Sequence, residues 1–103
     1  MKYQLVLQFP SDAFDDESAV ATLERALIEL LGDDAYVDGI DLGPAETSVF
    51  IFSADPAITF CRVTPLLERK ELLESVTAAH RQTDIERYTV IWPPDCRKQF
   101  RIQ

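Results

Sequence analysis

The side chains that could do chemistry in this chain are few, and they form no recognised motif. His80 is the only histidine, and Ser75, Asp84 and Glu86 lie near it without the spacing of a catalytic triad. A general base needs a positioned partner and a pKa near neutrality. We therefore expect His80 to be a surface or packed residue.

A small enzyme or a small-ligand sensor would place polar groups in a cleft between a sheet edge and its loops. The polar groups that such a cleft would use first are Asp41, Glu46, His80, Arg81 and Tyr88. This hypothesis requires several of them to converge within about 4 Å around a concave pocket.

The sequence predicts no metal and no cofactor. One histidine and two cysteines, Cys61 and Cys96, lie without the spacing of a metal site. The three glycines, Gly32, Gly39 and Gly43, do not form a phosphate-binding loop. No catalytic residue is assigned from the sequence.

Charge is distributed unevenly along the 103 residues, whose net charge is −8. Residues 1–55 hold 12 acids and 2 bases, whereas residues 56–103 hold 6 acids and 8 bases. An acidic surface repels phosphate backbones, so nucleic-acid binding is disfavoured. The acidic first half suits a basic partner protein or the C-terminal part of a second copy.

The location expected from the sequence is the cytoplasm. No stretch approaches the roughly 18 apolar residues of a membrane-spanning helix, and residues 1–10 lack the apolar core of a signal peptide. We expect Cys61 to be a small buried hydrophobe and Cys96 to be exposed. A disulfide between them is not expected in a reducing compartment.

The first half of the chain shows clear strand and helix periodicities. Tyr3–Phe9 alternates in the manner of a strand with one core face, and Asp15–Leu31 carries a helical apolar stripe that ends at Gly32. Turn residues at 43–46 join two strands, Tyr36–Leu42 and Ser48–Ser53. The apolar run in the second of these predicts a strand near the centre of a sheet.

The second half is less regular. Asp55 and Pro56 predict the start of a helix that reaches about Lys70–Leu73, with a bend or break near Val63–Thr64 caused by Pro65. Glu74–Gln82 fits either a helix extension or a strand, and we favour the strand. Ile85–Trp92 predicts a last strand, which ends at Pro93.

These elements predict an α+β fold of order βαββαββ, or βαββαβ if Glu74–Gln82 is helical. Two helices on one face of an antiparallel sheet would bury all the apolar stripes, which is the ferredoxin-like two-layer sandwich. Residues 1–94 would form a single domain, and residues 95–103 a polar tail.

Four stretches resemble a group of small bacterial proteins of unknown function. They are Tyr36-Val37-Asp38-Gly39-Ile40-Asp41-Leu42-Gly43, the Asp55-Pro56 helix start, Thr64-Pro65-Leu66-Leu67, and Tyr88-Thr89-Val90-Ile91-Trp92-Pro93-Pro94. The resemblance implies a bacterial source and a ferredoxin-like fold over most of residues 1–94. It brings no catalytic residues.

The favoured hypothesis is a non-enzymatic interaction module that forms a homodimer. A sheet with helices on one side leaves the other side uncovered, and pairing two copies would cover its apolar groups. Val6, Phe50, Phe52 and Ile91 are the predicted contact residues. The alternatives are the small-ligand sensor or enzyme described above, and an acidic immunity-type or inhibitor protein for a basic partner.

Overall fold

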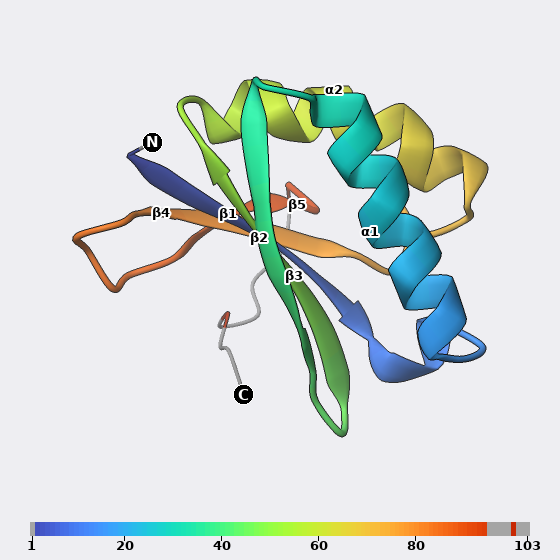
Figure 1. The fold of residues 1–103 in the computed structure, drawn as a ribbon. Coiled ribbons are helices and arrows are strands. Elements are labelled where there is room, and N and C mark those ends of the chain that lie inside the picture. The colour runs from blue at the N-terminus through green and yellow to red at the C-terminus, as the bar shows by residue number, and fades with distance from the viewer. Residues whose placement is uncertain (1, 95–99, 101–103) are drawn as a thin grey trace.

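The fold is a five-stranded antiparallel sheet with two helices on one face (Figure 1). The computed structural model describes residues 2–94 and residue 100. The elements in chain order are β1 (Tyr3–Pro10), the short 3-10 helix η1 (Ser11–Ala13), α1 (Glu17–Leu31), β2 (Ala35–Leu42), β3 (Glu46–Ser53), α2 (Pro56–Arg69), β4 (Thr77–Gln82) and β5 (Thr89–Trp92).

The strand order is β2-β3-β1-β4-β5, with β1 in the middle. The first four strands and the two helices give the ferredoxin-like layout, and β5 is a fifth strand added beyond β4. The predicted α+β class is therefore confirmed. The residues that the structure leaves undescribed include Cys96 and most of the predicted tail.

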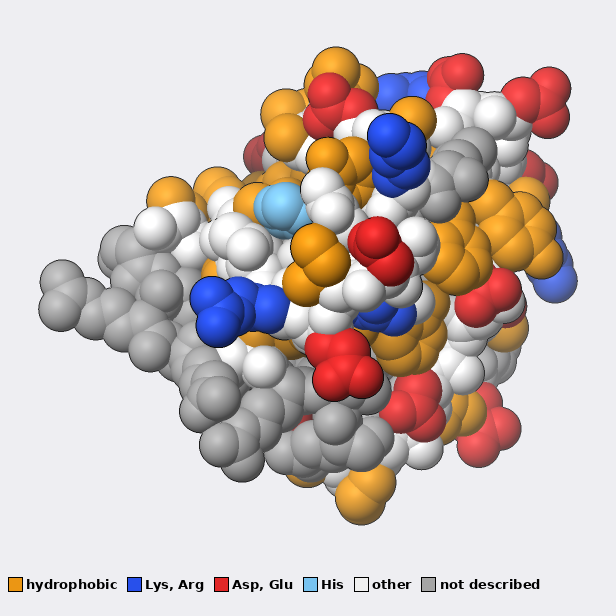
Figure 2. Space-filling view, turned by 90° about the vertical axis from the view of Figure 1, so that its left-hand side faces the viewer, with side chains coloured by type: hydrophobic (Ala, Val, Ile, Leu, Met, Phe, Trp, Pro, Cys, Tyr) orange, Lys and Arg blue, Asp and Glu red, His pale blue; other side chains and the backbone are white. Residues whose placement is uncertain are grey.

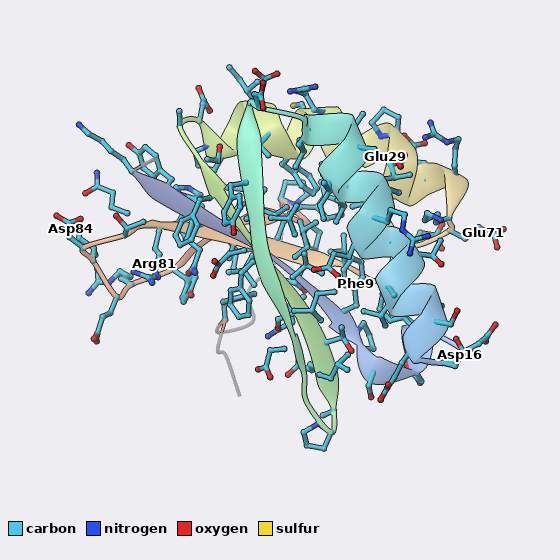
Figure 3. All side chains as sticks on the ribbon, viewed as in Figure 1. Phe9, Asp16, Glu29, Glu71, Arg81 and Asp84 are labelled. Carbon is cyan, nitrogen blue, oxygen red and sulfur yellow. The ribbon has the colours of Figure 1, made fainter. Side chains whose placement is uncertain are left out.

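The core fills the space between the sheet and the helices. Side chains of β1 alternate, so that Leu5, Leu7 and Phe9 face the helices and have no exposed surface. Phe9 is labelled in Figure 3. The three side chains meet fully buried residues of the two helices, Leu23, Leu27, Val63 and Leu67. Each buried side chain of this size contributes roughly 1.5–3 kcal/mol to folding.

Helix α1 begins and ends as local sequence chemistry dictates. The Asp16 carboxylate accepts a hydrogen bond of 3.0 Å from the Ala19 N–H, so the helix begins at Glu17 rather than at the predicted Asp15. Gly32 ends it with a φ of +55°, a conformation that favours glycine.

Helix α2 begins at Pro56, and the Asp55 carboxylate accepts a 3.2 Å hydrogen bond from the Ile58 N–H. The helix includes Pro65 and ends at Arg69, one residue before the predicted range. The expected burial of Cys61 is wrong, because its side chain is exposed. The buried stripe of α2 instead follows Thr59, Phe60, Val63, Leu66 and Leu67.

The ambiguous segment Glu74–Gln82 contains a strand, β4, from Thr77 onward. The last strand is shorter than predicted, since β5 begins at Thr89 and not at Ile85. Residues 83–88 form a loop instead. Trp92 at the end of β5 donates a 3.1 Å hydrogen bond from its Nε1 to the Leu73 carbonyl oxygen.

Candidate functional site

The side of the sheet away from α1 and α2, here called the helix-free face, is the candidate site. Cross-strand pairing arranges its side chains in three rows that run from β2 towards β5. The first row is Tyr36, Phe52, Gln4 and Arg81. The second row is Gly39, Phe50, Val6, Ala79 and Val90. The third row is Asp41, Ser48, Gln8 and Thr77.

The residues at the middle of the helix-free face are already buried in the single chain. Val6 and Ala79 have no exposed surface, and Gln4 and Gln8 are buried as well. Val6 lies on the face where the sequence placed it, but it is not accessible to a partner. Any contact surface is therefore made by the flanks of the face and not by its centre.

The first flank lies on β2 and β3 and is called the aromatic flank: Tyr36, Phe50 and Phe52. The Tyr36 side chain is 60% exposed, and its ring stacks on that of Phe52 with 6.5 Å between centroids and 10° between planes. Phe50 and Phe52 are half-buried. Two acids of β2, Asp38 and Asp41, lie on the same strand as Tyr36.

The sequence did not identify Tyr36 as a contact residue. The register of the β2–β3 hairpin would have revealed Tyr36 as a contact residue, because it places Tyr36 directly opposite Phe52 on one face. That register depends on a bulge between Val37 and Gly39, which periodicity alone does not predict. The predicted contact residue Ile91 lies elsewhere, since it packs against the hydrophobic core.

The second flank lies beside β4 and β5 and is called the Arg81 flank: Arg81, Tyr88 and Val90. The Arg81 Nε donates hydrogen bonds to the Gln4 Oε1 at 3.1 Å and to the Tyr88 hydroxyl at 3.3 Å. The Tyr88 hydroxyl in turn donates to the Gln4 Oε1 at 2.9 Å. The guanidinium carbon lies 5.7 Å from the centroid of the Tyr88 ring.

Arg81 also holds the loop that joins β4 to β5, at whose outer end Asp84 lies (Figure 3). Its Nη1 donates to the carbonyls of Gln82, Thr83 and Ile85, at 3.2, 3.0 and 3.0 Å. The ring of Phe100 packs against the Tyr88 ring with 5.0 Å between centroids. The guanidinium thus orders both the loop and the aromatic residue next to it.

The structure does not bring the five predicted cleft residues together. Arg81 and Tyr88 meet near the start of β1, where Arg81 pairs with Gln4. Glu46 pairs with Pro10 at the other end of β1, and Asp41 lies near that end too.

The remaining cleft candidate, His80, pairs with Leu5 and so faces the helix side of the sheet. Its ring meets the edge of Tyr3 with 6.1 Å between centroids, beside a shallow cavity of about 270 Å³ that Asp55 and Pro56 also line. Figure 2 shows the pale blue side chain of this only histidine on the end of the molecule, among hydrophobic and uncharged groups. Within the described residues, the His80 Nδ1 is buried without a hydrogen-bond partner.

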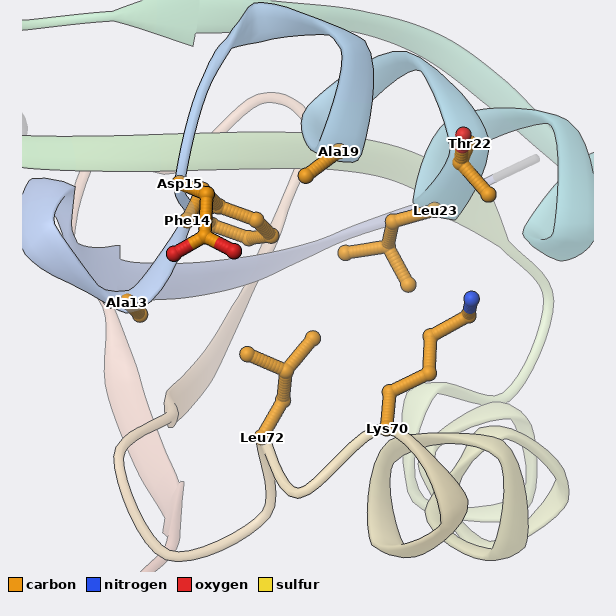
Figure 4. A pocket seen from close by; sticks show the side chains of 8 residues that line it. All are labelled: Ala13, Phe14, Asp15, Ala19, Thr22, Leu23, Lys70 and Leu72. Carbon is orange, nitrogen blue, oxygen red and sulfur yellow. The ribbon is translucent and has the colours of Figure 1, made fainter.

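A second cavity lies on the helix side, between the start of α1 and the connection from α2 to β4 (Figure 4). It has a volume of about 310 Å³ and an apolar lining that includes Phe14, Leu23 and Leu72, with Asp15 and Lys70 as its charged groups. Asp15 and Lys70 are both exposed.

Within residues 2–94 and residue 100, no group of three His, Cys, Asp or Glu side chains could hold a metal ion. No helix in that part of the chain is long and apolar enough to cross a membrane. The chain matches no family model, no curated protein and no solved structure. The geometry of the helix-free face is therefore the basis for the functional proposal.

Proposed function

We propose that this protein is a non-enzymatic interaction module that forms a homodimer through its helix-free face. The single observation that supports the proposal is the aromatic flank, because the stacked, exposed Tyr36 at the edge of the helix-free face is surface that association would remove from water. Large aromatic side chains of this kind contribute most of the binding energy in protein interfaces.

Self-association fits the fold because a two-fold dimer uses the same face of each copy. Half-buried Phe50 and Phe52 lie on one flank of the face and half-buried Tyr88 lies on the other, so both flanks carry apolar groups that a second copy could contact.

The test is the dissociation constant of the dimer, measured by light scattering over a range of concentrations. We expect Tyr36→Ser to weaken the dimer by about fivefold or more, because truncating an aromatic contact residue of this size costs at least about 1 kcal/mol. Ile58→Ser is the matched control, because Ile58 on α2 is 59% exposed, as Tyr36 is 60% exposed, but lies away from the face. Equal weakening by both substitutions would contradict the proposal.

A second candidate function is an acidic immunity-type or inhibitor protein for a basic partner. It is favoured by Asp38 and Asp41, which lie on β2 beside the aromatic flank. Retention of a basic protein from the source cell at low salt and its loss at high salt would support this function, since screening weakens exposed charge pairs. Binding that ignores salt would argue against it.

The small-ligand sensor or enzyme has less support, because Arg81 and Tyr88 meet but Asp41, Glu46 and His80 lie away from them. The resemblance to uncharacterised bacterial proteins brings no catalytic residues that would change this. A bacterial cytoplasm is the proposed location, and the free, exposed Cys61 supports it, because a reducing compartment preserves such a thiol. Cell fractionation that finds the protein outside the cytoplasm would contradict it.

A further inference from the structure

We propose that the C-terminal segment of the chain, residues 95–103, docks on the centre of the helix-free face and covers it. Of this segment the structure describes Phe100 alone. The inference goes beyond the proposed function and does not rest on it, because it concerns contacts within one copy.

The central side chains are buried more deeply than an open sheet face allows. Val6 and Ala79 have no exposed surface, and Gln8 is 4% exposed. The neighbours of Val6 across the strands are Phe50 and Ala79, and the single methyl group of Ala79 cannot shield it. Both helices lie on the opposite face (Figure 1), and an antiparallel sheet with one packed face commonly leaves the other to solvent. The burial therefore indicates a further layer of polypeptide over these residues.

The described residues on either side of positions 95–99 lie at opposite ends of the buried strip. Strand β5 ends near Thr77, which pairs with Gln8. The Phe100 ring packs against the Tyr88 ring, whose hydroxyl is bonded to Gln4. The distance along β1 from Gln8 to Gln4 is about 13 Å, at roughly 3.3 Å per residue. The chain from residue 94 to residue 100 can span up to about 20 Å, so it is long enough to cross the buried centre.

Charge favours the docking of this segment on its own domain. Residues 95–103 hold Arg97, Lys98 and Arg101 against Asp95, a net charge of +2, whereas residues 1–94 hold 17 acids and 7 bases, a net charge of −10. A basic segment is attracted to an acidic body. Asp41 places one carboxylate on the helix-free face itself.

A docked segment decides which part of the face a partner can reach. Tyr36 stays 60% exposed on β2, the edge strand farthest from β5. Release of the segment would expose Val6 and Ala79 and so enlarge the apolar surface of the face. The segment is thus an internal cover that restricts contacts to the flanks.

The experiment measures the accessibility of the covered centre in the full chain. Val6→Cys is prepared in a background of Cys61→Ser and Cys96→Ser, with and without Phe100→Ala, and its reaction with N-ethylmaleimide is followed under native conditions. We expect Phe100→Ala to speed the reaction by about tenfold or more, because it removes an aromatic contact that holds the segment in place. Val49→Cys is the matched control, because Val49 is fully buried in the same sheet but faces the helices.

Trypsin digestion of the chain without engineered cysteines is a second measurement, which does not depend on the folding of Val6→Cys. The segment contains cleavage sites after Arg97 and Lys98, and docking protects them. We expect cleavage there to be about tenfold or more faster in Phe100→Ala than in the unsubstituted chain, with cleavage after Arg25 in α1 unchanged. Equal rates at the two segment sites in both chains would overturn the inference.

Each outcome of the thiol experiment decides one point. Faster modification of Val6→Cys in the presence of Phe100→Ala, with Val49→Cys still protected, supports the covering segment. Rapid modification while Phe100 is intact, protection that Phe100→Ala leaves unchanged, or equal acceleration at both sites overturns it. Protection that appears only as the protein concentration rises also overturns it, because a second copy then covers the centre. A monomer by light scattering at every concentration removes the proposed function and leaves this inference standing.

Discussion

Replacing Arg81 by lysine should destabilise the domain although the charge is kept. The guanidinium makes hydrogen bonds through two nitrogens, with Nε bound to Gln4 and Tyr88 and Nη1 bound to three loop carbonyls. A lysine ammonium is a compact donor without the planar fork, so it cannot reach both groups of acceptors. About three hydrogen bonds would be lost, at a net 0.5–1.5 kcal/mol each.

The expected loss is therefore about 2–3 kcal/mol, with the lower figure favoured because the loop carbonyls are solvent-accessible and can turn to water. In a domain of this size that corresponds to a fall in Tm of roughly 10–20 °C. Urea unfolding monitored by the fluorescence of Trp92, the only tryptophan, would give the free energy of unfolding directly.

Arg87→Lys is the matched control, because Arg87 is exposed on the same loop and its substitution should change the free energy of unfolding by less than about 0.5 kcal/mol. If Arg81→Lys unfolds at the same urea concentration as this control, Arg81 does not order the loop. The shortening of β5 would then need another cause.

Three further substitutions test the fold that positions the helix-free face, each by urea unfolding. Gly43→Ala should cost about 1–3 kcal/mol, because its Cβ would lie 2.8 Å from the Glu46 carbonyl oxygen, whereas Gly39→Ala, with open space, should cost about 1 kcal/mol or less. Asp55→Ala should cost about 1 kcal/mol by removing the cap of α2, and no loss would mean that another group satisfies that helix end. Leu27→Ala should cost about 2–5 kcal/mol, and a loss under about 1 kcal/mol would contradict its place in the core.

Local patterns in the sequence predicted most of the fold because those patterns act over a few residues. The alternation in β1, the Asp55 cap with Pro56, and the turn at Gly43 each report the geometry of their own segment. Short connections between such elements leave few ways to build one sheet, so the ferredoxin-like order followed.

Features that depend on contacts between distant residues were not predictable in this way. Strand β5 begins at Thr89, four residues after the predicted start at Ile85. The reason is that Arg81 donates hydrogen bonds to carbonyl oxygens of the preceding loop. Cys61 is exposed because the buried stripe of α2 is set by Phe60 and Val63, and periodicity in a short helix containing Pro65 does not fix the rotation to one residue.

The candidate site was predicted in part. Phe50 and Phe52 lie on the helix-free face because strand alternation fixes the side on which a residue points. Whether a residue on that face is exposed to solvent depends on its neighbours, so Val6 is fully buried whereas Tyr36 is exposed. The five polar cleft candidates were chosen by residue type, and strand direction and alternation keep Asp41, Glu46 and His80 apart from the pair Arg81 and Tyr88.

Sedimentation equilibrium of the wild-type chain from low to high micromolar concentration tests the central claim most directly. If the helix-free face is a contact surface between copies, the average mass should rise from that of one chain, 11.7 kDa, towards twice that value as concentration increases. A mass that stays at that of one chain over the whole range would contradict the claim.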